Sequence, residues 1–360
     1  MPTFADITDL SMAMTLQGFH TTRRPNARFW QRFFNTDFYS PEDKIAFDRA
    51  LKDDRKVANF VMPNVVSKAN KREGYSTEMF APAYIKEKDV IEAFDPALFS
   101  RIAGEPFGGT MSPDERAQHM RAGFIDGHIV KIENRLNAMD AELVRTGKVT
   151  IKGEDYPETV VDYRRDPNNT ALLTGAQAWG QAGVNPFTSL GDAAMQIYDK
   201  CGGSAEDVVF SPQAWALFFK WITTEKKDWF STQTKGAPVV MSQIAAGNVY
   251  QVALLGSIIT DDGRTLNLWV DRSTYVDVDG SVVHHLKPYE VVIVDFQIFG
   301  GVQAFGAIKD FDAPNGIMPA RYFSKEFTEK EPSALFCLTQ SAPLPIAAQV
   351  NATFLLTVKS

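Results

Sequence analysis

Residues that commonly perform acid–base, nucleophilic or metal chemistry are few in this chain and are not spaced for it. His119 and His128 are nine residues apart, and His284 and His285 are adjacent in a predicted strand, where neighbouring side chains point to opposite faces. The sequence contains no HExxH, CxxC, GxSxG, GxGxxG or Walker motif, the usual signatures of zinc, serine-hydrolase, dinucleotide and phosphate-loop sites. We therefore expect no catalytic, cofactor or metal site, and we do not interpret the chain as an enzyme.

A cluster of arginine and aromatic residues near the N-terminus is the strongest binding signal. Residues 23–34 read RRPNARFWQRFF, and no acidic residue follows before Asp37. Interleaved Arg and aromatic side chains can neutralise and stack on nucleic acid, and they can also clamp an arm onto a partner subunit, because Trp and Arg are favoured interface anchors. We favour the partner subunit. The candidate contacts are Arg23, Arg24, Arg28, Trp30 and Arg32.

We assign residues 1–57 to this arm. Residues 1–72 contain twelve Lys and Arg against eight Asp and Glu, a formal charge of +4, which leaves −11 for the rest of the chain. We expect the arm to lie across neighbouring subunits, so that removal of residues 1–35 leaves the body folded.

The composition is that of a globular chain. The 360 residues are 44% hydrophobic and 22% charged, close to the average of soluble proteins, and suffice for about two domains. A net charge of −7 argues against a dedicated nucleic-acid-binding protein, which would normally be basic. No apolar stretch approaches the roughly 18 residues that a membrane span requires, and no signal peptide is recognisable. Cys201 and Cys337 are too few and too far apart for a disulfide framework, so we expect both to be reduced and passive, in a chain that folds in the cytoplasm.

The stretch from Ser112 to Thr146 has the signals of one long helix. Ser112 can cap its N-terminus, Pro113 suits the first helical position, and Gly147 can adopt the left-handed conformation that ends it. At about 1.5 Å per residue the helix would be roughly 50 Å long. Its apolar residues recur mostly at steps of three and four, which predicts one buried stripe: Met120, Phe124, Ile125, Ile129, Ile132, Leu136, Met139 and Leu143.

Residues 58–92 are predicted to form a long hairpin. Two strand-like segments flank a polar tip that contains Lys68, Lys71 and Arg72. With some fifteen residues in each strand the hairpin would extend up to about 50 Å. A two-stranded ribbon is marginal alone in water, so it should lie on its own domain or on another subunit.

The remaining chain alternates between strand and helix signals. A second hairpin is predicted at 148–162, a linker follows, and residues 188–305 are predicted to form a compact α/β unit with helices at 192–201 and 213–230. Its DVDG turn at 277–280 joins two short strands and lacks the downstream glutamate of a calcium loop. From residue 313 onward the chain is interpreted as irregular, with strand-like pieces separated by prolines.

Three separated segments resemble one known family. Residues 72–88, REGYSTEMFAPAYIKEK, place an aromatic, a proline, a tyrosine and a lysine after a small polar tip: Phe80, Pro82, Tyr84 and Lys86. ARYF at 320–323 followed by QSAPLPIAA at 340–348 is the second match, and SPQAWALF at 211–218 is a weaker third. In this order they resemble the capsid E family, the major capsid proteins of lambda-like bacteriophages.

The resemblance implies an α+β chain with the Hong Kong 97-type capsid fold. Its parts would be an N-terminal arm at 1–57, an E-loop at 58–92, and a peripheral domain at 93–174 whose spine helix is 112–146. An axial domain would follow at 175–305, and residues 306–360 would return to the peripheral domain.

The resemblance also implies a function and its partners. The chain would assemble with itself as hexamers and pentamers into an icosahedral shell, the virion capsid, built in the host cytoplasm around double-stranded DNA that it contacts non-specifically. A scaffolding protein, a decoration protein and a portal at one vertex would be further partners, with no membrane and no cofactor. We expect Lys68, Lys71, Arg72, Phe80, Tyr84 and Lys86 to contact neighbouring subunits. No motif assigns a covalent cross-link to a lysine.

Other classes stay open at this point. An encapsulin-like compartment shell would share the fold, whereas a DNA-binding module or a hydrolase would give a small oligomer in place of a very large particle.

Overall fold

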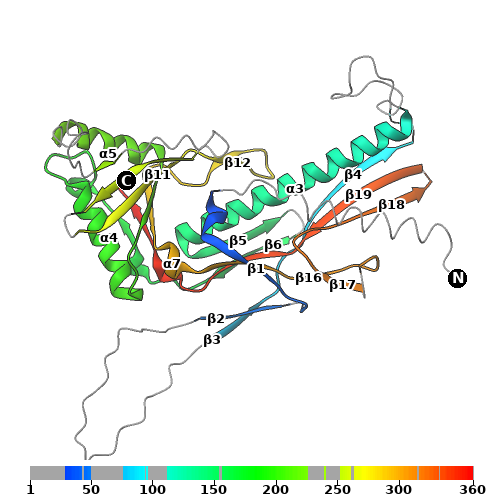
Figure 1. The fold of residues 1–360 in the computed structure, drawn as a ribbon, viewed down its shortest axis with the longest axis horizontal. Helices are drawn as coiled ribbons and strands as arrows, with labels where there is room; N and C mark the ends of the chain where they lie inside the picture. Colours follow the sequence, from blue (N-terminus) through cyan, green and yellow to red (C-terminus); the bar gives the residue numbers. More distant parts are fainter. Residues whose placement is uncertain are drawn as a thin grey trace, which may run out of the picture.

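The computed structural model describes residues 29–42, 44–49, 76–93, 95, 112–153, 156–225, 239–240, 252–260, 263–313, 316–331 and 333–359. The predicted contacts Arg23, Arg24, Arg28, Lys68, Lys71 and Arg72 lie outside these residues. One long helix, α3, crosses the molecule from a large sheet at one end to an extended ribbon of strands at the other (Figure 1).

Helix α3 (Pro113–Thr146) has the predicted ends. Ser112 and Glu115 form a capping box, in which the Ser112 backbone N–H donates to Glu115 (2.7 Å) and the Glu115 N–H donates to Ser112 Oγ (3.3 Å). At the C-terminus Gly147 has a φ of 72°, and its N–H donates to the Leu143 carbonyl. The apolar stripe is buried from Ile125 onward, so the helix prediction is confirmed.

A row of polar side chains on α3 is buried beside that stripe. Glu133, Asn137 and Asp140 follow each other at steps of four and three, so they share one face of the helix. Asn137 accepts a hydrogen bond from the Trp30 N–H (3.1 Å). The Asp140 carboxylate accepts from Gln303 Nε2 (2.6 Å), and burial raises its pKa well above the ordinary range.

Glu133 makes the largest set of these contacts. Its carboxylate accepts hydrogen bonds from Gln31 Nε2 (2.6 Å), from Arg321 Nε (2.9 Å) and from the Tyr322 hydroxyl. These donors come from the beginning and the end of the described chain. The helix is therefore joined to both through one buried charge.

The large sheet has seven strands in the order β7-β21-β14-β8-β11-β10-β9. Its strands are β7 (Thr170–Leu172), β21 (Thr353–Thr357), β14 (Glu290–Val294), β8 (Asp207–Phe210), β11 (Thr265–Asp271), β10 (Val252–Ile259) and β9 (Val239–Val240). Helices α4 (Pro186–Cys201) and α5 (Pro212–Glu225) pack in one core against this sheet. Val208 and Phe210 of β8 face that core, while Val209 faces the core that contains the end of α3, so β8 is buried on both faces.

The boundaries of this sheet differ from those predicted for the α/β unit. Strand β7 precedes residue 175, and β21 comes from the segment expected to return to the other domain, yet both pair within the sheet. Helix α4 begins at Pro186, six residues before the predicted start, because Asn185 caps it and Pro186 occupies the first position.

A three-stranded sheet, β1-β15-β20, lies at the centre of the molecule. It contains β1 (Phe34–Tyr39), β15 (Gly301–Phe305) and β20 (Pro343–Ala347), and a 3-10 helix, η1 (Trp30–Phe33), precedes it. Trp30 and Phe33 are 0% and 1% exposed. Residues 30–39 are thus part of the body, which corrects their assignment to a peripheral arm.

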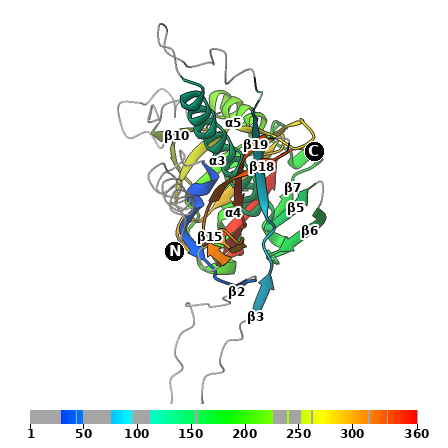
Figure 2. The same ribbon diagram turned by 90° about the vertical axis from the view of Figure 1, so that its right-hand side faces the viewer.

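Two ribbons extend from this centre. Strand β2 (Ile45–Arg49) pairs with β3 (Ser76–Phe80), so the first hairpin begins near residue 45 and not at 58. Both strands point away from the body in two perpendicular views (Figures 1 and 2). After Phe80 the chain joins a different sheet, in which β4 (Ile85–Glu92) pairs with β19 (Ser333–Ser341), and β19 pairs with β18 (Phe323–Lys330). This sheet lies beside α3, and it replaces the irregular structure expected after residue 313 (Figure 2).

Short elements complete the fold. The hairpin of β5 (Lys148–Gly153) and β6 (Tyr156–Asp162) and that of β12 (Thr274–Val276) and β13 (Val282–His284) confirm two predicted hairpins. Strands β16 (Ala307–Lys309) and β17 (Ile317–Pro319) form another. The remaining short helices are η2 (Pro167–Asn169), η3 (Gly175–Gln177), α7 (Phe296–Phe299) and η5 (Val350–Ala352). Among the described residues, no helix is both long and apolar enough to cross a membrane.

The position of Trp30 predicts the outcome of two truncations. Removal of residues 1–28 should leave a folded chain, because it keeps the buried aromatic side chains of Trp30, Phe33 and Phe34. Removal of residues 1–35 should prevent stable folding, because the loss of one buried large aromatic side chain costs about 3–5 kcal/mol and this truncation removes three. Thermal unfolding followed by circular dichroism distinguishes the two variants, and equal melting temperatures would contradict this account.

The buried Asp140 predicts a pH-dependent gain in stability. Because burial raises its pKa in the folded state, the folded chain holds a proton that the unfolded chain releases near pH 4, so the free energy of unfolding falls as the pH rises above that value. Asp140→Asn keeps the neutral shape and should raise stability at pH 8 by about 1–3 kcal/mol. The gain should vanish near pH 4. Melting curves at pH 4, 6 and 8 test this, with the exposed Glu158→Gln as the matched control. A loss of stability at pH 8 would refute it.

Candidate subunit interface

Trp30 does not present its side chain to a partner subunit. The indole is fully buried in its own chain, and its Nε1–H donates to Asp271 Oδ2 (2.8 Å). Phe29 and Phe33 pack beside the ring with centroids 5.3 and 6.0 Å away. The prediction that Trp30 is an intersubunit contact is therefore wrong, because no surface of the side chain is left for a neighbour.

Arg32 is also bound mainly by its own chain. One guanidinium nitrogen donates to Asp207 Oδ2 (2.5 Å), and the guanidinium carbon lies 4.3 Å from the centroid of the Trp269 ring. The side chain is 30% exposed, so a partner could reach only its edge. Trp30 and Arg32 together fasten the start of the described chain to the large sheet.

Phe80, Tyr84 and Lys86 lie together where β3 leads into β4. Phe80 is partly buried against the central core. The Tyr84 hydroxyl donates to the Ala307 carbonyl (2.7 Å), and the ammonium of Lys86 lies 5.4 Å from the centre of the Tyr84 ring. Tyr84 and Lys86 are exposed, so both side chains remain accessible to a neighbouring subunit. The hydrogen bond to Ala307 meanwhile holds Tyr84 against β16.

Sequence reasoning missed the polar row on α3. Glu133, Asn137 and Asp140 form a second row beside the predicted apolar stripe, and polar residues that border such a stripe at the same spacing are the signal that could have indicated buried partners. A second missed network involves His128, which is buried against β4 and β19. Its ring nitrogens lie 3.0 Å from Asp89 Oδ2 and 3.1 Å from Thr339 Oγ1.

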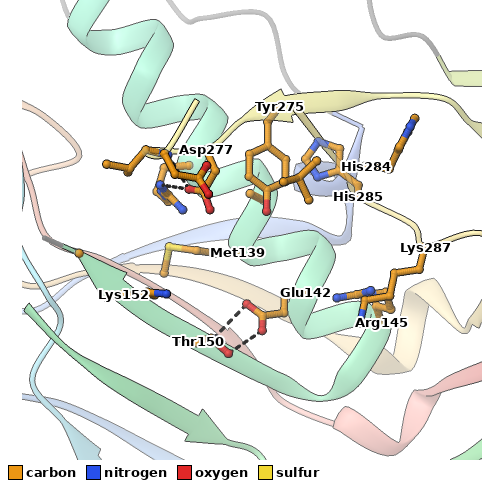
Figure 3. Close-up of a pocket in the computed structure, with 16 residues that line it drawn as sticks. Met139, Glu142, Arg145, Thr150, Lys152, Tyr275, Asp277, His284, His285 and Lys287 are labelled. Carbon is orange, nitrogen blue, oxygen red and sulfur yellow. Dashed lines mark hydrogen bonds and ion pairs between the residues drawn. The ribbon is translucent and has the colours of Figure 1, made fainter. Parts of the chain in front are cut away.

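A cavity of about 700 Å³ lies between α3, the β5–β6 hairpin and the β12–β13 hairpin (Figure 3). Most of the charged side chains that line the cavity form an ion pair or a hydrogen bond within the chain. Arg135 pairs with Asp277 (2.9 Å), and Glu142 accepts from the Thr150 hydroxyl (2.7 Å). Arg145 reaches Glu290 behind the cavity wall (3.3 Å).

His285 lines one end of this cavity. Burial, together with the positive charges of Arg145 and His284, lowers the pKa of His285 to about 4. The neutral ring accepts a hydrogen bond from Asn137 Nδ2 (3.1 Å), so its proton is assigned to Nδ1.

The thiols and carboxylates offer little other chemistry. Neither Cys201 nor Cys337 forms a disulfide, and burial raises the pKa of the Cys337 thiol to about 12, which keeps it protonated at neutral pH. No group of three or more His, Cys, Asp or Glu side chains within the described ranges is placed to hold a metal ion.

Exposed apolar side chains instead mark where the molecule can contact another. Some of them, such as Leu172, Met195 and Ile259, lie on the large sheet and helix α4. Others lie on hairpins and outer strands: Met79 on β3, Val90 on β4, Val276 and Val282 on the β12–β13 hairpin, Val160 on β6, and Phe311 after β16. Val276 and Val282 are cross-strand partners, so they form one apolar face. Together with Tyr84 and Lys86, these residues define the candidate interface.

Known proteins share both the sequence and the fold of this chain. The family model described as phage major capsid protein E matches residues 13–358. The P21 prophage-derived major head protein of Escherichia coli O6:H1 is 24% identical over 328 residues, which covers 89% of this chain and 90% of the relative. The major capsid protein of Escherichia phage lambda is 23% identical over 296 residues, covering 81% of this chain and 82% of the relative.

A solved structure extends the likeness to the fold. The crystal structure titled putative capsid protein of a prophage of E. coli CFT073 aligns with a TM-score of 0.62 at 21% identity and covers 79% of each chain. This confirms the predicted α+β capsid architecture. Since the family model spans nearly the whole sequence, the chain belongs to the phage major capsid protein E family.

Proposed function

We propose that the chain assembles as hexamers and pentamers into an icosahedral shell that encloses the double-stranded DNA genome of a tailed bacteriophage. The observation that carries the proposal is the family match over residues 13–358. Relatives named as major head or capsid proteins align over most of their own length, so the likeness is not confined to one domain.

The architecture supports a role in self-assembly. The strand pairs β2–β3 and β18–β19 extend beyond the compact cores (Figure 1), and apolar side chains such as Met79 are left exposed on them. Apolar surface on projecting elements is typical of protein–protein contact sites. A subunit of a closed shell would bury it against its neighbours.

The proposed partners follow from the same role. During assembly in the host cytoplasm a scaffolding protein would guide the shell, a portal would occupy one vertex, and a decoration protein would bind the finished capsid. The packaged DNA would be contacted without sequence specificity, and only weakly, since the net charge of −7 makes extensive phosphate binding unfavourable. The proposal includes no membrane partner.

The division into parts is also a proposal, adjusted to the strands observed. The spine helix is α3, the E-loop extends from β2 through β3, and the axial domain is the seven-stranded sheet with α4 and α5. The peripheral part contains α3, β4, β18 and β19.

The direct test is the size of the purified particle. Expression of the full chain should yield material that elutes near the exclusion limit of a large-pore column and appears as hollow shells by electron microscopy. Co-expression with a scaffolding protein from the same genome serves as a second condition. A chain that stays a folded small oligomer in both conditions would refute the proposal and would favour a DNA-binding module or a hydrolase.

The basic tip of the first hairpin gives a sharper prediction. We expect trypsin to cut unassembled chain at Lys68, Lys71 or Arg72, whereas assembled shells resist, because the tip would then lie on a neighbouring subunit. Changing all three residues to Glu should leave a folded chain that fails to form closed particles, since most of the chain beyond residue 72 is acidic. Equal cleavage in both states, or normal shells from the triple variant, would contradict this.

A further inference from the structure

The side chain of Phe311 is the most exposed large hydrophobic group in the described part of the chain. Its relative exposure is 104%, whereas the next highest, that of Val278, is 73%. Phe311 lies in the loop between β16 and β17, where Ile317 is a further exposed apolar residue. Phenylalanine is normally among the more buried residue types, so full exposure of the ring needs a reason.

The backbone on both sides of Phe311 is held in place. Asp310 Oδ1 binds the ammonium of Lys325 (2.7 Å), and Asp310 Oδ2 accepts from Gln340 Nε2 (3.0 Å). Asp312 Oδ2 binds the same Lys325 ammonium (2.8 Å), and the Asp312 N–H donates back to Asp310 Oδ1 (3.0 Å). The two acids that flank the ring are thus turned toward β18 and β19, and the ring points away from them.

Packing and hydrogen bonds also hold the two ends of this loop in place. Ile308 and Ala313 are buried in a small core with Phe323 and Ala342. The Tyr84 hydroxyl donates to the Ala307 carbonyl, and it accepts a weaker hydrogen bond from the Lys309 N–H (3.4 Å). These contacts hold the backbone segment that carries the ring.

We infer that Phe311 is an anchor that each copy of the chain inserts into an apolar recess on a second copy. The inference rests on the proposed function, in which every copy must bury surface against other copies. Aromatic side chains presented on a rigid frame make strong contact anchors, because little conformational freedom is lost when they bind.

The charges favour a second copy over a different protein. Residues beyond 72 carry a formal charge of −11, so copies of this chain repel one another unless their contacts avoid unpaired acids. In this loop Lys325 pairs with both Asp310 and Asp312, and together with the adjacent Lys309 the two cations balance the two acids. The loop therefore offers an apolar ring to an acidic neighbour without adding net negative charge, and the neighbour need not supply a cation.

Substitution of the ring separates assembly from folding. Phe311→Ala should melt within about 2 °C of the original chain as free subunits, since surface changes away from special features usually have small effects. Its yield of closed particles should fall at least tenfold, and Phe311→Leu should restore part of it. The matched control is Phe219→Ala on helix α5, outside the candidate interface, which removes an exposed ring that packs on Trp215 of the same chain.

Photocross-linking identifies what the ring touches. p-Benzoylphenylalanine at position 311 of the full chain, irradiated in assembled particles, should give covalent dimers whose cross-linked peptides come from two copies. The same group at 219 should link mainly within one copy. Cross-links from 311 only within its own copy or only to another protein, or a normal particle yield from Phe311→Ala, would overturn the inference. If the unmodified chain itself forms no particles, the proposed function fails instead.

Discussion

The carboxylate of Glu133 is the contact on which the arrangement of the chain most depends. It is buried on α3 and is satisfied by Gln31, Arg321 and Tyr322. A buried carboxylate without such partners would be strongly destabilising, so the fold is favourable only when the N-terminal segment and the region near residue 321 both reach the helix. The central sheet also joins the start of the chain to a segment near its end, because β15 pairs with β1 on one side and with β20 on the other.

The polar row on α3 fixes the positions along the helix at which distant segments of the chain bind. Asn137 meets Trp30 and His285, and Asp140 meets Gln303 of β15, so neighbouring positions of one helix face recognise different parts of the chain. Apolar packing alone would tolerate a shift of these segments along the helix, whereas hydrogen bonds of fixed geometry do not. We interpret the row as a device for specificity, obtained at a cost in stability that the raised pKa of Asp140 reflects.

The sequence predicts what is local and misses what is not. The ends of α3 follow from Ser112 and Gly147, and the hairpins at 148–162 and 274–284 follow from strand and turn signals a few residues apart. The pairings of β2 with β3 and of β21 with β7 leave no such signal, because their partners lie far away in the chain. The prediction for Trp30 is wrong for a related reason: an aromatic and arginine cluster suits a partner subunit and the chain's own core equally well, and only the distant Asp271, which binds the indole, distinguishes the two.

The place of β21 inside the large sheet has a consequence for biosynthesis. Residues 353–357 lie between β7 and β14, and therefore leave the ribosome after every strand to which they bind. Until then β7 and β14 keep unpaired edges, and the apolar side chains of Phe354 and Leu356 are missing from the core that α4 and α5 cover. A nascent chain thus cannot close this sheet early, and until its last residues are made the open edges are sites at which unfinished copies can associate.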